Sequence, residues 1–504
     1  MKKIDAIIVG ASNSGLMAGL ELLNEGYKVL VLDEHNNIGE SSKVVRVGRF
    51  NFDLNDHVYY LGDSDRSYRL DNLLQKVGVE DEIYLTSLES FYTVICGDEE
   101  YTMPFGLDAF KEKMEEYVPG SLESMNAFID LASECGKAME FIVDNIGKEI
   151  SYDEFKENYS NFIKVAPCSV STVLDSLGMP LKAQEILNAC WMYFASSEVE
   201  ISFVQYAMFI YDAICNGLYI PVNGSYDVTM LLSQAFLEKG GEIKLNSKVD
   251  KILVEDGKVT GVKLNDNTVY YSNIVIASSM ESKVYREMIE PSDIPRDALK
   301  SINKREIGPS KFTVNLGINR SVEELGLQEY SYLLYDSLDS DMVMTKLQEP
   351  NNSNEMVTVT NVINPDISDK GTSIINLSTL VVDNIFDNYI DDTNYQDYLI
   401  DEANRLINRF EKNTKIRIKD YIEEINIISP VRYSYINKEH NGSMFGYKLK
   451  GLDNLVPRIM NYKNELYIEG LYLCGGFMGD AFGYDSDIMS GYIAAKVAIN
   501  RTEE

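Results

Sequence analysis

Histidine is scarce in this sequence of 504 residues, which contains three histidines and six cysteines. The cysteines are scattered and form no Cys-x-x-Cys pair, so we expect neither a zinc site nor a disulfide framework. Basic residues are outnumbered, because 46 Lys and Arg stand against 79 Asp and Glu and leave a formal charge of −33. This balance argues against nucleic acid as a partner, since binding a phosphate backbone requires a basic surface.

Long apolar runs are missing as well. No stretch reaches the roughly 18 residues that a transmembrane helix requires, so none is expected. The opening letters MKKIDAIIVG contain only a short apolar run, too brief for a signal peptide. We therefore expect a cytoplasmic protein with reduced thiols. Apolar residues make up 45% of the chain, which is enough for a full core in two or three structural units.

The first motif is IIVGASNSGLMAGLELL, residues 7–23, followed by the apolar run YKVLVLDE. A buried strand, a Gly-rich turn, an amphipathic helix and a second strand are typical of dinucleotide binding. Gly10 makes the tight turn, and Gly15 lets the helix pack close to the sheet. Ser12 replaces the usual middle glycine, and its hydroxyl could donate to a phosphate oxygen. With Ser14, these residues are predicted to hold a pyrophosphate at the helix N-terminus.

Two acidic residues follow the second strand. Asp33 ends the strand and Glu34 comes next. An acid at this position accepts hydrogen bonds from a ribose 2′-hydroxyl, which favours FAD or NAD over a 2′-phosphorylated cofactor. Either Asp33 or Glu34 could be the acid that binds the ribose. A strand–helix–strand unit that binds nothing is the alternative, because fold does not imply function.

Further motifs lie downstream in a consistent order. They are EHNNIGE and VGRFNFDLNDH, the block at residues 217–279, and the terminal LYLCGGFMGDAFGYDSDIMSGYIAAKVAIN. Together they resemble the FAD-dependent phytoene desaturases and carotenoid isomerases from about residue 4 to 499. The resemblance implies an α/β fold, in which a Rossmann-like FAD-binding domain of the p-hydroxybenzoate hydroxylase type carries an inserted α+β substrate domain.

The resemblance also implies discontinuous domains. The FAD-binding domain would comprise residues 1–75, 216–290 and 430–504. The substrate-binding domain would comprise residues 76–215 and 291–429.

Several cofactor contacts follow from the same resemblance. Val249 would present its backbone to the adenine, and Lys43, Arg46 or Arg49 could lie near the pyrophosphate. The last helix, expected at about residues 487–500, would point its N-terminus at the flavin pyrimidine and so bring Asp487 and Ile488 to the cofactor.

Three positions depart from the family pattern. Besides Ser12, Glu40 follows Gly39 where many members have a second glycine. Gly476 follows Gly475 where many members have an acid that binds the ribityl chain. Weak, altered or absent flavin binding is therefore left open.

Candidate catalytic groups are few. The terminal block holds three carboxylates that are unusual for the family, Asp480, Asp485 and Asp487, and a buried one could act as a general acid or base. For Asp485 and Asp487 the alternative is capping of the last helix. His57 is a further candidate, with a packed or surface role as the alternative. Cys474 is expected to be a buried, inert thiol.

Two segments bear on the substrate. Residues 189–221 are dense in aromatic residues and methionines and include Trp191, the only tryptophan. They could line an apolar tunnel, and ordinary helical core is the alternative. Residues 107–150 indicate amphipathic helices with a turn at Pro119–Gly120, which could cap the site or contact a membrane face.

We therefore predict an FAD-dependent desaturase, saturase or cis–trans isomerase whose partner is a small apolar, isoprenoid- or lipid-like substrate. A flavin amine oxidase on the same fold is one alternative, which would require an aromatic cage and a lysine-held water. A flavin-free, prenyl-binding protein of the GDP-dissociation-inhibitor type is the other. The sequence does not indicate an oligomeric state.

Overall fold

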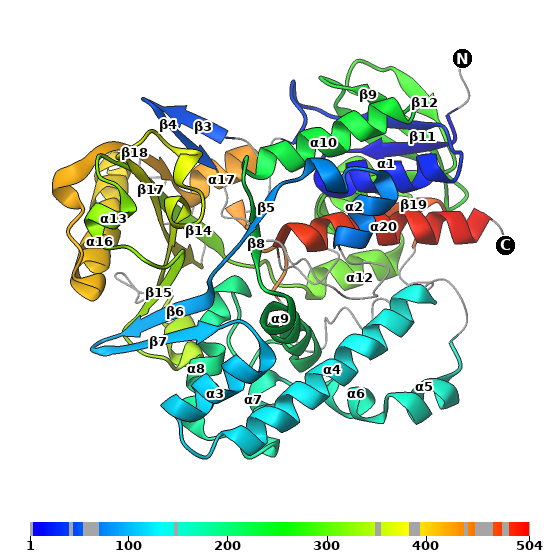
Figure 1. Ribbon diagram of the computed structural model, residues 1–504. Helices are drawn as coiled ribbons and strands as arrows, with labels where there is room; N and C mark the ends of the chain where they lie inside the picture. Colours follow the sequence, from blue (N-terminus) through cyan, green and yellow to red (C-terminus); the bar gives the residue numbers. More distant parts are fainter. Residues whose placement is uncertain are drawn as a thin grey trace.

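The computed structural model describes residues 4–39, 44–53, 70–145, 150–347, 354–382, 394–437, 442–448, 467–475 and 483–502. Two sheets organise these residues (Figure 1). The first has five strands in the order β19-β13-β1-β2-β9, and the second has seven in the order β18-β14-β17-β16-β15-β6-β7. Helices cover both sheets, so the chain has the expected α/β fold.

The five-stranded sheet is parallel throughout. Its strands are β1 (Ala6–Val9), β2 (Val29–Leu32), β9 (Glu242–Lys244), β13 (Val275–Ser278) and β19 (Leu471–Cys474). The side chains of β1 alternate between two cores: Ile8 packs with the helices and Ile7 packs with a three-stranded sheet. Burial on both faces explains why these strands are continuous apolar runs.

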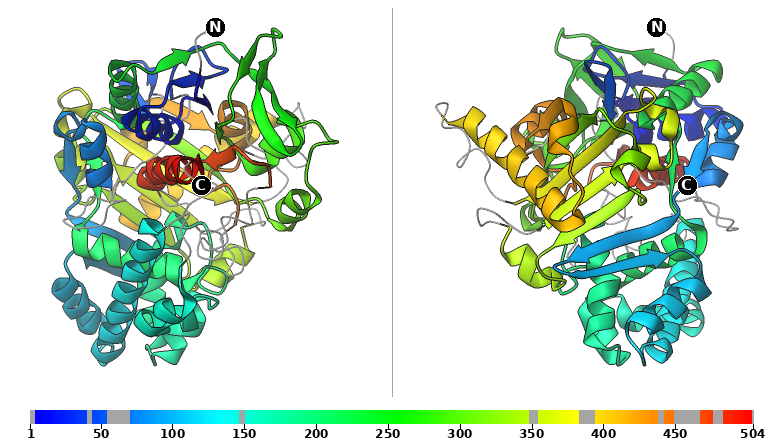
Figure 2. Two further views of the ribbon diagram at one scale, coloured as in Figure 1. Left: turned by 90° about the vertical axis from the view of Figure 1, so that its right-hand side faces the viewer. Right: turned by 60° about the vertical axis from the view of Figure 1, so that its left-hand side comes forward.

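Three helices cover one face of this sheet, namely α1 (Asn13–Asn24), α10 (Ser225–Glu238) and α20 (Gly483–Thr502). The other face carries β10 (Val249–Glu255), β11 (Lys258–Leu264) and β12 (Val269–Tyr271). Helices α1 and α20, from opposite ends of the chain, lie side by side (Figure 2). A Cβ on Gly491 of α20 would lie 2.1 Å from the Ser14 carbonyl oxygen, so this close approach requires glycine.

The seven-stranded sheet is antiparallel except where β15 pairs with β6. Its strands are β6 (Ser90–Cys96), β7 (Glu99–Pro104), β14 (Ser310–Ile318), β15 (Ser331–Tyr335), β16 (Asn354–Val359), β17 (Ser373–Val381) and β18 (Ile422–Ile428). Helix α16 (Tyr395–Thr414) packs on one face, which we call the outer face. We call the opposite face the inner face.

A helical layer fills the space below the two sheets in Figure 1. It contains α3 (Leu107–Tyr117), α4 (Leu122–Asp144), α5 (Tyr152–Asn158), α6 (Ser160–Val165), α7 (Val170–Ser176), α8 (Leu181–Asn188), the short helix η3 (Ala189–Tyr193) and α9 (Phe203–Asn216). The predicted amphipathic helices and the turn at Pro119–Gly120 are confirmed by α3 and α4. Among the described helices, none is both long and apolar enough to cross a membrane.

Two short ribbons join the units. Strand β5 (Leu85–Ser87) pairs with β8 (Tyr219–Pro221), where the chain passes between the helical layer and the five-stranded unit. The hairpin of β3 (Val44–Val47) and β4 (Phe50–Asp53) reaches the seven-stranded sheet, because the Arg49 guanidinium lies 2.6 Å from the Glu423 carboxylate.

Candidate dinucleotide-binding site

The carboxyl ends of β1, β2, β13 and β19 meet at one edge of the parallel sheet. Ligands of open α/β sheets bind outside this edge. Four segments come together there: the turn from Gly10 to Gly15, Asp33 after β2, Ser278 at the end of β13 and Gly475 after β19. This edge is the candidate site.

Both glycines of the first turn are required by the geometry. Gly10 has a φ of +104°, which L-residues rarely adopt, and a Cβ there would lie 3.2 Å from the Ser278 carbonyl oxygen. A Cβ on Gly15 would lie 2.2 Å from the Gly10 carbonyl oxygen. The turn therefore brings helix α1 against β1 as closely as a backbone allows.

Ser12 fits the position of the missing middle glycine. Its φ of −80° and ψ of 174° are extended and open to any residue. Its hydroxyl caps α1 by accepting the Gly15 N–H at 3.1 Å. The same oxygen lies 2.8 Å from the Ser14 hydroxyl and 2.5 Å from the Ser278 hydroxyl, and these last two hydroxyls are 2.9 Å apart. The three serines form a triangle at the N-terminus of α1.

Sequence reasoning missed Ser278. The only signal was that the apolar run IVIASS ends in small polar residues, as expected for a strand that ends at a ligand site. Its proximity to Ser12 depends on β13 being the neighbour of β1, which short-range patterns do not predict.

Asp33 stabilises the turn and still has room for a ligand. Its carboxylate accepts the Ala11 N–H at 2.6 Å through one oxygen and the His35 N–H at 2.8 Å through the other. The side chain is 8% exposed. The oxygen that accepts the His35 N–H also lies 2.9 Å from the His35 Nδ1. An ionised carboxylate has about four acceptor positions, so one remains for a ribose hydroxyl.

Glu34 and Val249 lie nearby in different settings. Lys248 and Lys283 approach the Glu34 carboxylate at 3.8 and 3.9 Å, so two cations balance its charge at the surface. The Ser247 N–H donates to the Asp33 carbonyl oxygen at 2.7 Å, which brings the start of β10, at Val249, beside the acidic pair. Val249 itself is 4% exposed.

The start of the last helix differs from the prediction. Helix α20 begins at Gly483 rather than near Asp487, so its free N–H groups belong to the four residues before Asp487. Asp487 and Ile488 lie in the second turn, where their N–H groups are used inside the helix. Gly and Asp in this stretch are frequent in turns, and their turn propensity is overridden here by the packing of α20 against α1.

The Asp487 side chain reaches the first helix of the chain. Its carboxylate accepts the Ser14 N–H at 3.3 Å, so it stands at the positive end of α1. The expectation that Asp487 lies in the first turn of its own helix is wrong, because α20 begins at Gly483. A catalytic role for Asp487 stays a prediction. Gly475, with φ +119°, is joined to the same helix because its N–H donates to the Ser490 hydroxyl at 2.8 Å.

The arginines of the β3–β4 hairpin are engaged elsewhere. Arg49 pairs with Glu423 and, at 3.6 Å, with Asp369, so its charge is balanced by the seven-stranded unit. Arg46 is exposed, and its Nε donates to the Gly48 carbonyl oxygen at 3.4 Å. The remaining predicted residues lie outside the described ranges: Lys43, His57, Gly476 and Asp480, together with the off-pattern Glu40.

Cys474, just before Gly475, is an inert thiol as expected. It is fully buried, and burial raises the pKa of its thiol to about 12. A thiol that stays protonated at physiological pH is a poor nucleophile.

The aromatic segment behaves as core. Trp191 is 2% exposed and stacks on Tyr335 with ring centroids 5.7 Å apart. Phe194 packs edge-on against Phe209 at 4.5 Å. The alternative interpretation as ordinary helical core therefore holds for these side chains, although they lie over the inner face of the seven-stranded sheet.

The turn from Gly10 to Gly15, together with Asp33 and Ser278, forms what we call the cradle, and it fits a pyrophosphate-bearing dinucleotide. The two required glycines bring the α1 N-terminus to the sheet edge, and the serine hydroxyls and the acid after β2 offer donors and acceptors there. Among the described residues at the α1 N-terminus, the Asp487 carboxylate opposes an anion.

Comparisons with known proteins agree with this geometry. A model of the family described as flavin containing amine oxidoreductase matches residues 13–363. Among curated proteins, all-trans-retinol 13,14-reductase of Danio rerio is 22% identical over 95% of this chain and 84% of its own. Prolycopene isomerase 1 of an Oncidium hybrid cultivar is 22% identical over 98% and 83%. A phytoene desaturase of Rhodobacter capsulatus is 24% identical over 60% and 57%.

Solved structures share the fold. A double mutant of putrescine oxidase superposes with a TM-score of 0.65 at 13% identity, covering 100% of this chain and 99% of that one. Cyclohexylamine oxidase from Brevibacterium oxydans superposes with a TM-score of 0.63 at 13% identity, covering both chains fully. At this identity the likeness concerns the fold alone.

Proposed function

We propose that this chain, which belongs to the flavin containing amine oxidoreductase family, is an FAD-dependent enzyme that desaturates, saturates or isomerises an apolar, unsaturated isoprenoid-like substrate. The expectation of FAD is confirmed by family membership. The single observation that carries the proposal is the cradle at the α1 N-terminus, where Gly10 and Gly15 permit a tight turn and close packing and Asp33 presents a carboxylate.

The curated relatives support the substrate class. Their names specify retinol, phytoene and prolycopene as the molecules that they reduce, desaturate and isomerise. These molecules are all unsaturated isoprenoids, while the three reactions differ. We therefore commit to the substrate class and leave the three reactions as the set to be tested.

Each part of the cofactor has proposed partners in this chain. The N–H groups at the start of α1 and the hydroxyls of Ser12 and Ser14 would hold the pyrophosphate. Asp33, with Glu34 beside it, would hold the adenosine ribose, and the Val249 backbone would face the adenine. The assignments to Gly475, Gly476, Lys43, Arg46 and Ile488 stay proposals on family resemblance. So does the division into a cofactor unit (residues 1–75, 216–290 and 430–504) and a substrate unit (residues 76–215 and 291–429).

The bound flavin would supply hydride or electron transfer to and from carbon. The chain would orient the substrate and exclude water, for which the buried helical layer over the inner face is suited. Proton transfer remains assigned to Asp480 or His57 as a proposal. Asp487 is less suited to that role, because the Ser14 N–H holds its carboxylate at the cofactor.

One observation favours the amine oxidase alternative. Lys311 on β14 is 7% exposed and lies on the inner face, because its neighbour Phe312 packs in the core beneath α16. A buried lysine is the residue type that this alternative requires. Aliphatic and aromatic amines therefore belong in the substrate screen, and turnover of amines alone would favour the alternative.

The first experiment is the visible absorption spectrum of the purified protein, with mass analysis of the released cofactor. We expect a flavin spectrum and FAD. Anaerobic mixing with polyenes should then bleach the flavin or change the polyene spectrum. A colourless protein that cannot be reconstituted with FAD would refute the proposal. A cytoplasmic location and a peripheral membrane contact through α3 and α4 remain proposals for cell fractionation to test.

A further inference from the structure

A row of polar side chains crosses the inner face of the seven-stranded sheet. Asn315 of β14 is paired in register with Asn426 of β18 on one side and Asn376 of β17 on the other. Thr358 of β16 pairs with Asn376, and Ser331 of β15 pairs with Thr358. Paired residues point to the same face of a sheet. We call these five residues on five neighbouring strands the polar belt.

The belt lies on the inner face. Val314 and Leu316, the chain neighbours of Asn315, pack in the core beneath α16 on the outer face. Since successive side chains of a strand alternate, Asn315 points the other way. In Figure 1, α16 lies on the left of this sheet, and α9, α17 (Pro430–Asn437) and the five-stranded unit lie on its right.

Contacts on both sides of Asn315 join β14 to the cofactor unit. Two residues before Asn315, the Thr313 hydroxyl accepts a hydrogen bond from the hydroxyl of Tyr433 in α17 at 3.1 Å. Two residues after it, a Cβ on Gly317 would lie 2.4 Å from the ring of Phe50 in β4. Asn315 therefore faces the junction between the two units, and ligand sites favour such junctions.

Asn376, Thr358 and Ser331 are hydrogen-bonded, whereas within the described residues the amide nitrogen of Asn426 and both amide atoms of Asn315 are not. The Asn376 amide donates to the Thr358 hydroxyl at 3.2 Å, and the Ser331 hydroxyl lies 3.2 Å from the hydroxyl of Tyr193 in η3. Asn315 is 1% exposed, yet neither its amide nitrogen nor its amide oxygen has a hydrogen-bond partner in the part of the chain that the structure describes. A buried polar group without a partner is costly, and in native proteins nearly all of them are satisfied.

We propose that Asn315 binds an oxygen-bearing group, a hydroxyl or carbonyl, on the substrate. The inference rests on the proposed isoprenoid-directed function and narrows its substrate class from isoprenoids in general to those that carry oxygen. The amide offers two donors and one acceptor oxygen, which a hydroxyl matches in both senses. A pure hydrocarbon would leave the amide unsatisfied and should bind more weakly for that reason.

A matched ligand pair tests this. The FAD-loaded enzyme is equilibrated with geranylgeraniol and, separately, with the same hydrocarbon chain in which hydrogen replaces the hydroxyl. Dissociation constants are measured by equilibrium dialysis. We expect the alcohol to bind about tenfold more tightly, the difference that one hydrogen bond to a buried group supplies. Asn315→Leu should bring the two dissociation constants within about threefold of each other, mainly by weakening the binding of the alcohol.

Two further variants separate recognition from folding. Asn315→Ser replaces the amide with a hydroxyl one bond closer to the backbone and should retain part of the preference, so the inference can still be tested should the leucine variant fail to fold. Glu355→Gln alters a buried carboxyl on the outer face of the same sheet and should leave the preference unchanged.

The outcomes of the binding experiment distinguish a failure of this inference from a failure of the proposed function. A wild-type enzyme that binds both ligands equally, or a preference that survives Asn315→Leu, overturns the role of Asn315 and leaves the proposed function intact. If neither ligand binds the FAD-loaded enzyme, the isoprenoid-directed function fails and the inference fails with it.

Discussion

The Asp487 carboxylate accepts the backbone N–H of Ser14 at 3.3 Å, so an acidic side chain from the last helix stands at the N-terminus of the first. Helix N-termini attract anions, and in dinucleotide-binding folds the pyrophosphate takes this position. In this chain the protein therefore places an anion of its own where a cofactor phosphate would bind.

We predict that Asp487→Asn tightens FAD binding by about threefold to tenfold. The amide keeps the size and the acceptor oxygen of the side chain but removes a charge that repels phosphate, a change of about 1 kcal/mol for partly solvated charges a few ångströms apart. The apoprotein is titrated with FAD and the quenching of flavin fluorescence is followed.

The control for Asp487→Asn is Glu238→Gln, which removes a charge at the exposed end of α10. It should leave the dissociation constant unchanged. A weaker affinity in Asp487→Asn would show that the carboxylate supports the cofactor instead of competing with it.

Ser12 gives a second prediction, because its hydroxyl caps α1 and its backbone does not need glycine. Ser12→Ala should lower the free energy of unfolding by about 1 kcal/mol, whereas Ser12→Gly should cost only a few tenths. FAD affinity of Ser12→Gly should stay within about threefold of the wild type. Urea denaturation and FAD titration measure the two quantities. A gain in affinity of tenfold or more would mean that the serine side chain obstructs the phosphate.

Local signals predicted one half of the cradle. Gly10, Gly15 and Asp33 lie within one strand–helix–strand unit, where backbone conformation and close packing depend on neighbours in the chain. The middle position was harder, since only the observed φ of −80° shows that serine fits there.

The other half of the cradle depends on distant segments. Ser278 meets Ser12 because β13 is the neighbour of β1, and Asp487 meets Ser14 because α20 packs along α1. The start of α20 was misplaced since its first turn is rich in residues that favour loops. The polar belt was invisible for a similar reason: Asn315 and Asn376 are opposed only once the register of two strands is known.

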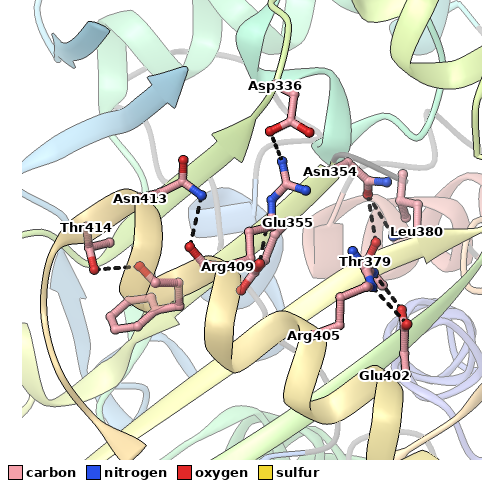
Figure 3. A network of polar contacts seen from close by, with 11 residues as sticks. Asp336, Asn354, Glu355, Thr379, Leu380, Glu402, Arg405, Arg409, Asn413 and Thr414 are labelled. Atoms are coloured by element: carbon pink, nitrogen blue, oxygen red, sulfur yellow. Dashed lines mark hydrogen bonds and ion pairs between the residues drawn. The ribbon is translucent and has the colours of Figure 1, made fainter. Parts of the chain in front are cut away.

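A buried ion pair beneath α16 supports a third prediction (Figure 3). Glu355 is fully buried, and its carboxylate lies 3.8 Å from the Arg409 Nε without a hydrogen bond. Arg409 also pairs with Asp336 at 3.0 Å. Burial raises the pKa of the Glu355 carboxyl well above its usual 4.5, while the nearby arginines only partly oppose the rise.

The direction in which Glu355 makes stability depend on pH follows from how tightly its proton is held in the folded state. The folded state holds this proton to higher pH than the unfolded chain, so the contribution of Glu355 to stability is full below about pH 4.5 and falls as pH rises. Glu355→Gln should therefore change little at pH 4.5 and raise the free energy of unfolding by about 1 kcal/mol or more at pH 8. Urea denaturation at both pH values checks this. A loss of stability at pH 8 would show that the ionised pair with Arg409 is net stabilising.

The acid Glu198 supports a fourth prediction at a different contact. The loop before α9 meets α14 (Ser340–Thr345), where the Ser197 hydroxyl donates to Asp341 at 3.2 Å and the Glu198 N–H donates to the Ser340 hydroxyl at 3.2 Å. Burial, with weaker contributions from Asp339 and Asp341, raises the pKa of the Glu198 carboxyl from 4.5 to about 7.

Between about pH 4.5 and 7 the folded protein therefore keeps a proton on Glu198 that the unfolded chain releases. The contribution of Glu198 to the free energy of unfolding is therefore fully present below pH 4.5 and is lost as the pH rises through 7. Glu198→Gln should match the wild type at pH 4.5 and exceed it at pH 8 by about 1–2 kcal/mol, allowing for partial exposure to solvent. The exposed acid Glu82, changed to Gln, serves as the control and should show no such difference. The same difference in the free energy of unfolding between wild type and Glu198→Gln at both pH values would contradict the raised pKa. A difference of the opposite sign would mean that the ionised carboxylate is stabilised at this contact.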